Sequence, residues 1–225
     1  MDSGIMKPNL KTTVILLYVP VMLTVFRYFG WPDFYSGSIS NTPGPGPQYY
    51  YFISSLVLLG IVPMLIATFG LHLGLRDLGL GLGNLKASLI FSLIGLPVMI
   101  ILAYLSAKNP SLQAEYPLYR NLLVQKEGLS IYLLIYGLYY IGWEVFFRGF
   151  MLFGLRESFG DGHSILIQTI PSCLMHIGKP GAEIFASILA GLVFGWVALK
   201  CRSIWPVFIS HWGLGAFVDI FIIYG

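Results

Sequence analysis

The sequence predicts an all-α, polytopic bundle of about seven membrane-spanning helices (six to eight), and three observations support this fold class. Of the 225 residues, 56% are hydrophobic and only 10% are charged, whereas a soluble domain carries roughly 25% charged residues. The mean hydropathy is +0.78. Apolar stretches of roughly 20 residues, long enough to cross a hydrocarbon core of about 30 Å, recur along the chain. This composition excludes a soluble globular protein.

Each expected span is an apolar segment bounded by polar or turn-forming residues. The seven segments are 12–29, 49–71, 87–107, 130–155, 164–177, 182–199 and 204–224. A Gly-, Pro- and Ser-rich stretch, 36–48, separates the first two. Residues 73–85 repeat Leu and Gly with few charges and are predicted to lie at the membrane interface. The fifth segment is short, so we expect it to be tilted or buried among its neighbours.

The positions of Lys and Arg predict the topology. Seven of them fall at one end of the predicted bundle, namely Lys7, Lys11, Arg76, Lys86, Arg156, Lys200 and Arg202, and four at the other, namely Lys108, Arg120, Lys126 and Lys179. The richer end of a membrane protein is normally cytoplasmic. We therefore expect an integral protein of the plasma membrane with a cytoplasmic N-terminus. The scattered net charge of +3 excludes a nucleic-acid partner and leaves the lipid bilayer as the expected environment.

Ionisable side chains inside predicted spans are the candidate functional residues, because burying such a group in a membrane costs roughly 2.5–3.5 kcal/mol or more. Glu144 and Arg148 lie four residues apart, on one helical face, and are predicted to form an ion pair. Such a pair has a purely structural interpretation as well as a functional one.

Two histidines and two further carboxylates complete the set. His176 ends the fifth segment and His211 lies within the seventh. Glu183 follows in the first turn of the sixth span, where a carboxylate also suits the helix dipole. Asp219 lies two turns after His211, so it is expected to support that ring only indirectly.

Glu144, Arg148, His176 and His211 come from three successive segments, which can surround one interior cavity. A carboxylate with two imidazoles could act as a general base with electrophilic partners. Alternatively, Glu144, His176 and His211 could bind a divalent metal such as zinc. The helix motif typical of zinc proteases, HExxH, is absent from the sequence.

The order of these residues resembles the CAAX protease and bacteriocin-processing family, also called CPBP or Abi proteins. That family shows Glu-Glu-x-x-x-Arg, then Phe-x-x-x-His, then His-x-x-x-Asn or Asp on successive helices. The matching residues here are Glu144 and Arg148, then His176, then His211. The resemblance implies that residues 129–225 are catalytic-type helices, and that 1–128 are N-terminal membrane helices and loops of the same membrane domain.

The sequence departs from the family pattern at two functional positions. Trp143 stands where the family has the first Glu, which its proposed mechanism uses to activate water, and Gly215 stands at the Asn or Asp position. The resemblance implies an intramembrane protease, of glutamate or metallo type, cleaving a membrane-associated peptide or protein with Glu144 as base. The alternatives are a catalytically degenerate binding or immunity protein, and a transporter or proton relay.

Overall fold

The computed structural model describes residues 9–225, and this part of the chain is helical with no strand. The predicted all-α class is confirmed. The α-helices are α1 (Leu10–Phe29), α2 (Pro32–Ser38), α3 (Gly46–Ser54), α4 (Val62–Leu65), α5 (Leu85–Ser106), α6 (Pro110–Glu115), α7 (Leu129–Glu144), α8 (Gly154–Leu174), α9 (Gly181–Cys201) and α10 (Trp205–Tyr224). The π-helical segments are η1 (Ser55–Ile61), η2 (Ile66–Gly70) and η4 (Val145–Phe153), and η3 (Arg120–Leu123) is a 3₁₀ turn.

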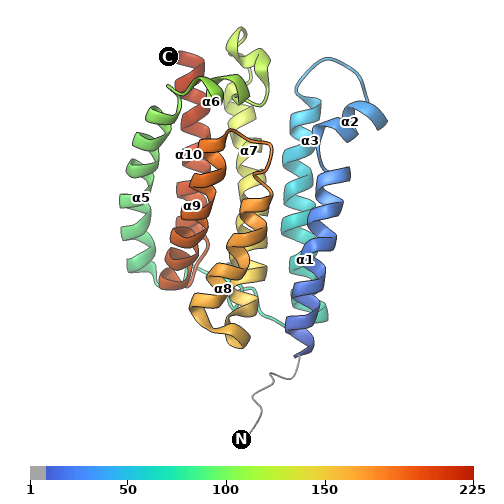
Figure 1. Cartoon of the computed structure of the whole chain (residues 1–225), viewed down its shortest axis with the longest axis vertical. Coiled ribbons are helices and arrows are strands. Elements are labelled where there is room, and N and C mark those ends of the chain that lie inside the picture. Colours follow the sequence, from blue (N-terminus) through green and yellow to red (C-terminus); the bar gives the residue numbers. More distant parts are fainter. Residues whose placement is uncertain (1–8) are drawn as a thin grey trace, which may run out of the picture.

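Six helical stretches are long and apolar enough to cross a membrane. One of them, Leu129–Leu174, has 46 residues and would be about 69 Å long if straight, more than twice the hydrocarbon thickness. It turns back at Gly160, whose φ of 72° and ψ of 170° break the helix; this positive φ favours glycine. The stretch therefore forms two helices that run in opposite directions, which gives seven candidate crossings in the described chain, and Figure 1 places the start of α1 and the end of α10 at opposite ends of the bundle.

The fifth predicted span is the part of α8 that follows Gly160. It is short, but it is not enclosed by its neighbours, because Leu166, Ile170 and Leu174 form an exposed apolar stripe at helical spacing. That face is available to lipid. Burial of this span, one of the two alternatives expected from its length, is therefore wrong.

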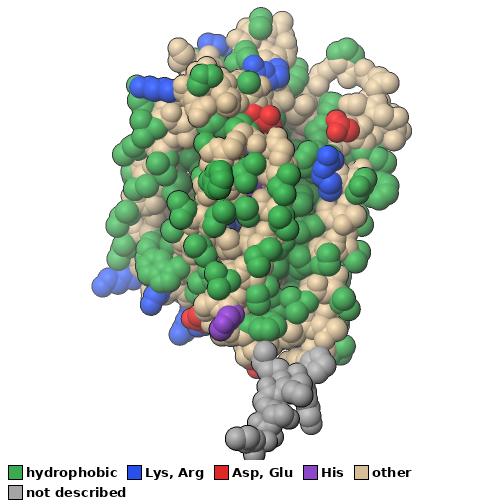
Figure 2. Space-filling view, viewed as in Figure 1, with side chains coloured by type: hydrophobic (Ala, Val, Ile, Leu, Met, Phe, Trp, Pro, Cys, Tyr) green, Lys and Arg blue, Asp and Glu red, His purple; other side chains and the backbone are tan. Residues whose placement is uncertain are grey.

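Charged side chains gather toward the two ends of the bundle and apolar side chains cover the surface between them (Figure 2). Lys11, Arg76, Arg156 and Arg202 line one cleft at the end where α1 begins. Lys179 forms an ion pair with Glu115 at the other end. Members of the two predicted groups of cations thus lie at opposite ends of the helix bundle. Lys7 lies outside the described residues.

The core is strongly aromatic and joins the N-terminal and C-terminal helices. Phe52 of α3 stacks on Tyr136 of α7 with ring centroids 4.6 Å apart, and Tyr51 stacks on Phe26 of α1 at 5.5 Å. All four side chains are buried. Aromatic pairs of this kind contribute about 0.5–1.5 kcal/mol beyond the burial of their area. They hold α7, whose last residue is Glu144, against α3, and α3 against α1.

In α9, Ser187, Gly191 and Gly195 recur every four residues, which predicts a packing seam within the bundle, and Gly191 and Gly195 pack against α8. A methyl group added at Gly191 would lie 2.6 Å from the Thr169 side chain. Gln168 donates a hydrogen bond to the Gly191 carbonyl at 2.8 Å. Small residues allow two helix backbones to approach closely within a membrane. The seam therefore fixes α9, and with it Glu183, beside α8.

The segment between η2 and α5 closes the end of the bundle at which α9 ends and α10 begins. Its Leu78 is buried. The backbone N–H of Asn84 donates to the Cys201 carbonyl at 2.7 Å, and the Ile204 N–H donates to the Gly79 carbonyl at 2.9 Å. These bonds tie the predicted interfacial segment to the turn from which α10, carrying His211, begins.

Candidate functional site

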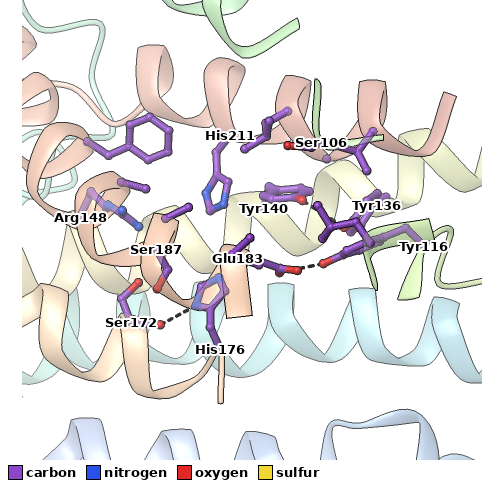
Figure 3. A pocket seen from close by; sticks show the side chains of 18 residues that line it. Ser106, Tyr116, Tyr136, Tyr140, Arg148, Ser172, His176, Glu183, Ser187 and His211 are labelled. Atoms are coloured by element: carbon purple, nitrogen blue, oxygen red, sulfur yellow. Dashed lines mark hydrogen bonds between the residues drawn. The ribbon is translucent and has the colours of Figure 1, made fainter. Parts of the chain in front are cut away.

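A cavity of about 180 Å³ lies within the bundle between α7, η4, α8, α9 and α10, with α6 at one end (Figure 3). Its α9 wall is built from Ala182, Ala186, Ala190 and Phe194, which recur every four residues and so share one face. The alanines leave room that larger side chains would fill. The cavity therefore has an apolar stripe on α9, next to Glu183 and Ser187 of the same helix, and is polar where the candidate residues meet.

His176 and His211 extend into this cavity from different elements, the turn after α8 and the middle of α10 (Figure 3). His176 Nδ1 donates to the Ser172 carbonyl at 2.8 Å, and His211 Nδ1 lies 2.6 Å from Glu144 Oε1. Because a neutral imidazole that donates from Nδ1 accepts at Nε2, each ring presents an acceptor nitrogen that has no hydrogen-bond partner among the described residues. The predicted convergence of the two rings on one cavity is present in the structure.

Glu144 lies behind His211 and does not line the cavity. It is fully buried, and its carboxylate is 3.2 Å from Arg148 Nε, so the predicted ion pair is present. Arg148 in turn lines the cavity and faces the Phe194 ring at 5.6 Å. Glu144 is the last residue of α7 and directly precedes the π-helical segment η4, a local widening that is common at functional sites. The carboxylate therefore holds His211 and Arg148 in place and has no surface left for water.

Glu183 lines the same cavity as the two histidines. Its Oε1 accepts a hydrogen bond from the Tyr116 hydroxyl at 2.8 Å. Its Oε2 is buried and has no hydrogen-bond partner in the described chain. Tyr116 belongs to the loop after α6, outside the spans. Burial and the Glu183 carboxylate raise the pKa of Tyr116 well above its ordinary value, so this hydroxyl stays protonated and donates.

At Trp143 and Gly215, the two positions that depart from the family pattern, the structure shows which side chains pack against the residue. Trp143 is buried, and its indole packs edge-on against the His176 ring at 5.4 Å. At Gly215, an added methyl group would lie 2.0 Å from the Tyr140 hydroxyl oxygen. This hydroxyl therefore occupies the space that a side chain at position 215 would need. Tyr140 also donates to the Tyr136 hydroxyl at 3.0 Å, and both line the cavity.

Asp219 is not brought to the cavity. It is buried, and its Oδ2 accepts a hydrogen bond from the Tyr132 hydroxyl at 3.0 Å. The predicted indirect support of His211 by Asp219 finds no contact here. The two-turn separation carries the carboxylate along α10 to a different part of α7.

The predicted zinc ligands do not form a set. Within residues 9–225, no three His, Cys, Asp or Glu side chains are placed together so as to hold a metal ion. The Glu144 carboxylate is engaged by Arg148 and His211, so it does not complete a site with the two rings. Two imidazoles and a carboxylate are donors that zinc accepts, but the described side chains are not arranged to hold the ion, and the roles that follow involve only side chains.

The helices that build this cavity are also those that resemble known proteins. Residues 125–217 match the family described as type II CAAX prenyl endopeptidase Rce1-like. The predicted resemblance to the CAAX proteases is confirmed. Comparison with curated proteins and with solved structures gave no match. The match contains Glu144, Arg148, His176, Glu183 and His211, and it supports a membrane endopeptidase in general terms.

Sequence reasoning did not single out Tyr116 and Tyr140. Tyr140 lies in a run of α7 rich in tyrosine, where hydroxyls at membrane depth are a signal of polar interior contacts. Tyr116 lies in a polar loop and carries no comparable signal. Only the packing of this loop against α9 brings its hydroxyl to Glu183.

Proposed function

We propose that this chain is an intramembrane endopeptidase that hydrolyses a peptide bond of a membrane-associated peptide or protein. One observation carries the proposal: two imidazoles from separate elements present free Nε2 atoms to one interior cavity, beside the buried cation Arg148. The alanine-lined wall of α9 leaves space for an extended peptide. The match to a membrane endopeptidase family supports the same reaction class.

His176 is the group that binds the attacking water, because its Nε2 carries a lone pair while Nδ1 donates to Ser172. His211 lies across the cavity and accepts a hydrogen bond from the N–H of the scissile peptide group. Glu144 is a positioning residue, since it touches His211 and Arg148 but does not line the cavity.

The water oxygen attacks the carbonyl carbon, and the electron pair of the C=O π bond becomes the oxyanion. Arg148, which lines the cavity, is the donor that faces this developing charge. Donors of this kind lower the barrier because they are fixed before the reaction begins. Cleavage of the C–N bond then releases a carboxylic acid and an amine.

The test is cleavage of membrane-tethered fluorogenic peptides by the purified protein in lipid nanodiscs. We expect His176→Ala and His211→Ala each to lower kcat/KM at least about 100-fold, the size of a lost acid–base or electrostatic contribution. His163→Ala is the matched control, since that ring is exposed close to the Gly160 turn of α8 and does not line the cavity. We expect chelators to leave the activity unchanged. Full activity in both cavity-histidine variants would refute the assignment.

A non-catalytic protein that binds a peptide or a partner is the second candidate. It is favoured by Trp143 and Gly215, which replace two functional side chains of the family pattern. It predicts that no tethered peptide is cleaved, and that the cellular effect of the protein survives replacement of both cavity histidines. Loss of the effect in those variants would exclude it.

For its location, we propose the plasma membrane, with the cation-rich end of the bundle, where α1 begins, on the cytoplasmic side. The end that carries α6 and the turn between α8 and α9 then faces outward. In this orientation the end of the cavity lined by Tyr116 and Glu183 is the end nearer the outer side.

A further inference from the structure

The proposed hydrolysis needs a group that accepts a proton from water. The side chains around the cavity show which carboxylate can do this. Glu183 is the only carboxylate among the described residues that line it. Glu144, the carboxylate next to Trp143, is buried behind His211 and engaged by two partners. Trp143 itself offers an indole N–H, which donates and cannot accept a proton.

Glu183 has the features of a reactive group and lacks those of a structural one. The N-terminus of α9 has no side-chain cap, so this carboxylate does not serve as a helix cap. Its hydrogen bond goes instead to Tyr116, from a distant loop, which fixes one oxygen and leaves Oε2 buried and unpartnered among the described residues. A buried acceptor without a partner is unfavourable, and a bound water that donates to Oε2 would relieve this cost.

The nearby cation does not neutralise Glu183. Lys179 forms its ion pair with Glu115 and lies over the Tyr116 ring, 5.2 Å from the ring centroid. Glu183 itself forms no ion pair with any described residue within 4 Å. Figure 3 shows its carboxylate at the side of the cavity, between His176 and Tyr116. One oxygen is thus held by a hydroxyl, while the other has no hydrogen-bond partner among the described residues.

We propose that Glu183 is the general base of the reaction and replaces the carboxylate absent at position 143; this inference rests on the proposed endopeptidase function. Water bound to His176 Nε2 attacks the peptide carbonyl carbon, and its second proton passes to Glu183 Oε2. When the C–N bond breaks, the protonated Glu183 returns this proton to the departing nitrogen. The carboxylate is regenerated, and the products are one carboxylic acid and one amine.

The test compares Glu183→Gln, which keeps the shape of the side chain but removes its basicity, with the wild type in the nanodisc cleavage assay. We expect kcat to fall at least about 100-fold while KM changes less than about threefold. Glu115→Gln is the matched control, because it removes a carboxylate near the same end that does not line the cavity. It should keep near wild-type kcat.

A second variant keeps the inference testable if the amide disturbs folding. Glu183→Ala should be inactive, and added formate should restore a measurable part of kcat by supplying a small carboxylate, while it leaves His176→Ala inactive. Wild-type kcat in Glu183→Gln would overturn the role of Glu183 and leave the endopeptidase proposal standing. Absence of cleavage by the wild type would overturn both.

Discussion

The buried pair of Glu144 and Arg148 gives a sharp energetic prediction. Glu144 is 0% exposed and Arg148 is 1% exposed, so neither charge is screened by water. Removing one partner from such a pair typically costs about 3–5 kcal/mol, because the other charge stays buried without compensation. We therefore expect Glu144→Gln to destabilise the protein by about 3 kcal/mol. For a chain of this size, this lowers the melting temperature by roughly 6–12 °C.

A double variant tests whether the uncompensated buried charge of Arg148 causes this loss of stability. Glu144→Gln combined with Arg148→Met removes both charges, and the Gln oxygen still accepts from His211 Nδ1. Replacing a buried pair by uncharged groups is often neutral, so we expect the double variant to melt near the wild type, with a coupling energy above about 2 kcal/mol. Detergent-solubilised protein would be followed by tryptophan fluorescence on heating. Additive losses in the double variant would refute the reasoning.

The cleavage rate of the same variants separates the role of Glu144 and Arg148 in catalysis from their effect on stability. The exposed ion pair of Lys11 with Glu157 provides the control. The double variant should remain inactive despite its recovered stability, because Arg148 faces the reacting carbonyl group. Glu157→Gln removes the partner of Lys11, and the Glu157 side chain is 79% exposed. It should leave both the melting temperature and the cleavage rate unchanged.

Two further predictions concern packing and topology. Gly215→Ala should destabilise the protein by about 1–3 kcal/mol and lower activity, since its methyl group would lie 2.0 Å from the Tyr140 hydroxyl; Gly137→Ala, whose nearest neighbour would be 3.4 Å away, is the tolerated control. An equal melting temperature for the two variants would contradict this packing. Cysteines introduced at Glu157 and Lys126 should react with an impermeant maleimide from opposite sides of the membrane, Lys126 from the outside of intact cells. Labelling of both positions from the same side would exclude the seven-crossing arrangement.

The sequence predicted the membrane bundle because the hydrocarbon core sets both the length and the composition of a spanning helix. Each expected apolar segment corresponds to a helical stretch in the structure. The predicted connection between the fourth and fifth spans, residues 156–163, is helical in the structure except at Gly160, where the chain turns back. A single backbone angle there decides between one long helix and two crossings.

Local spacing also predicted the pairing of Glu144 with Arg148 and the small-residue seam of α9. Both follow from helical periodicity, in which residues four apart share a face. The same periodicity placed Asp219 on the face of His211. It could not show that two turns of rise would carry Asp219 to Tyr132 instead.

The sequence by itself determined that this protein is a membrane bundle with ionisable residues in its interior. Burying a charge in lipid is costly, so the few charged residues within apolar segments are expected to face the inside of the bundle. Only the tertiary structure decided which of those residues meet. It placed Glu144 behind His211, brought Glu183 and the Tyr116 hydroxyl to the cavity, and filled the space at Gly215 with the Tyr140 hydroxyl. The physical reason is that these contacts join helices far apart in the chain, and their geometry depends on how whole helices pack.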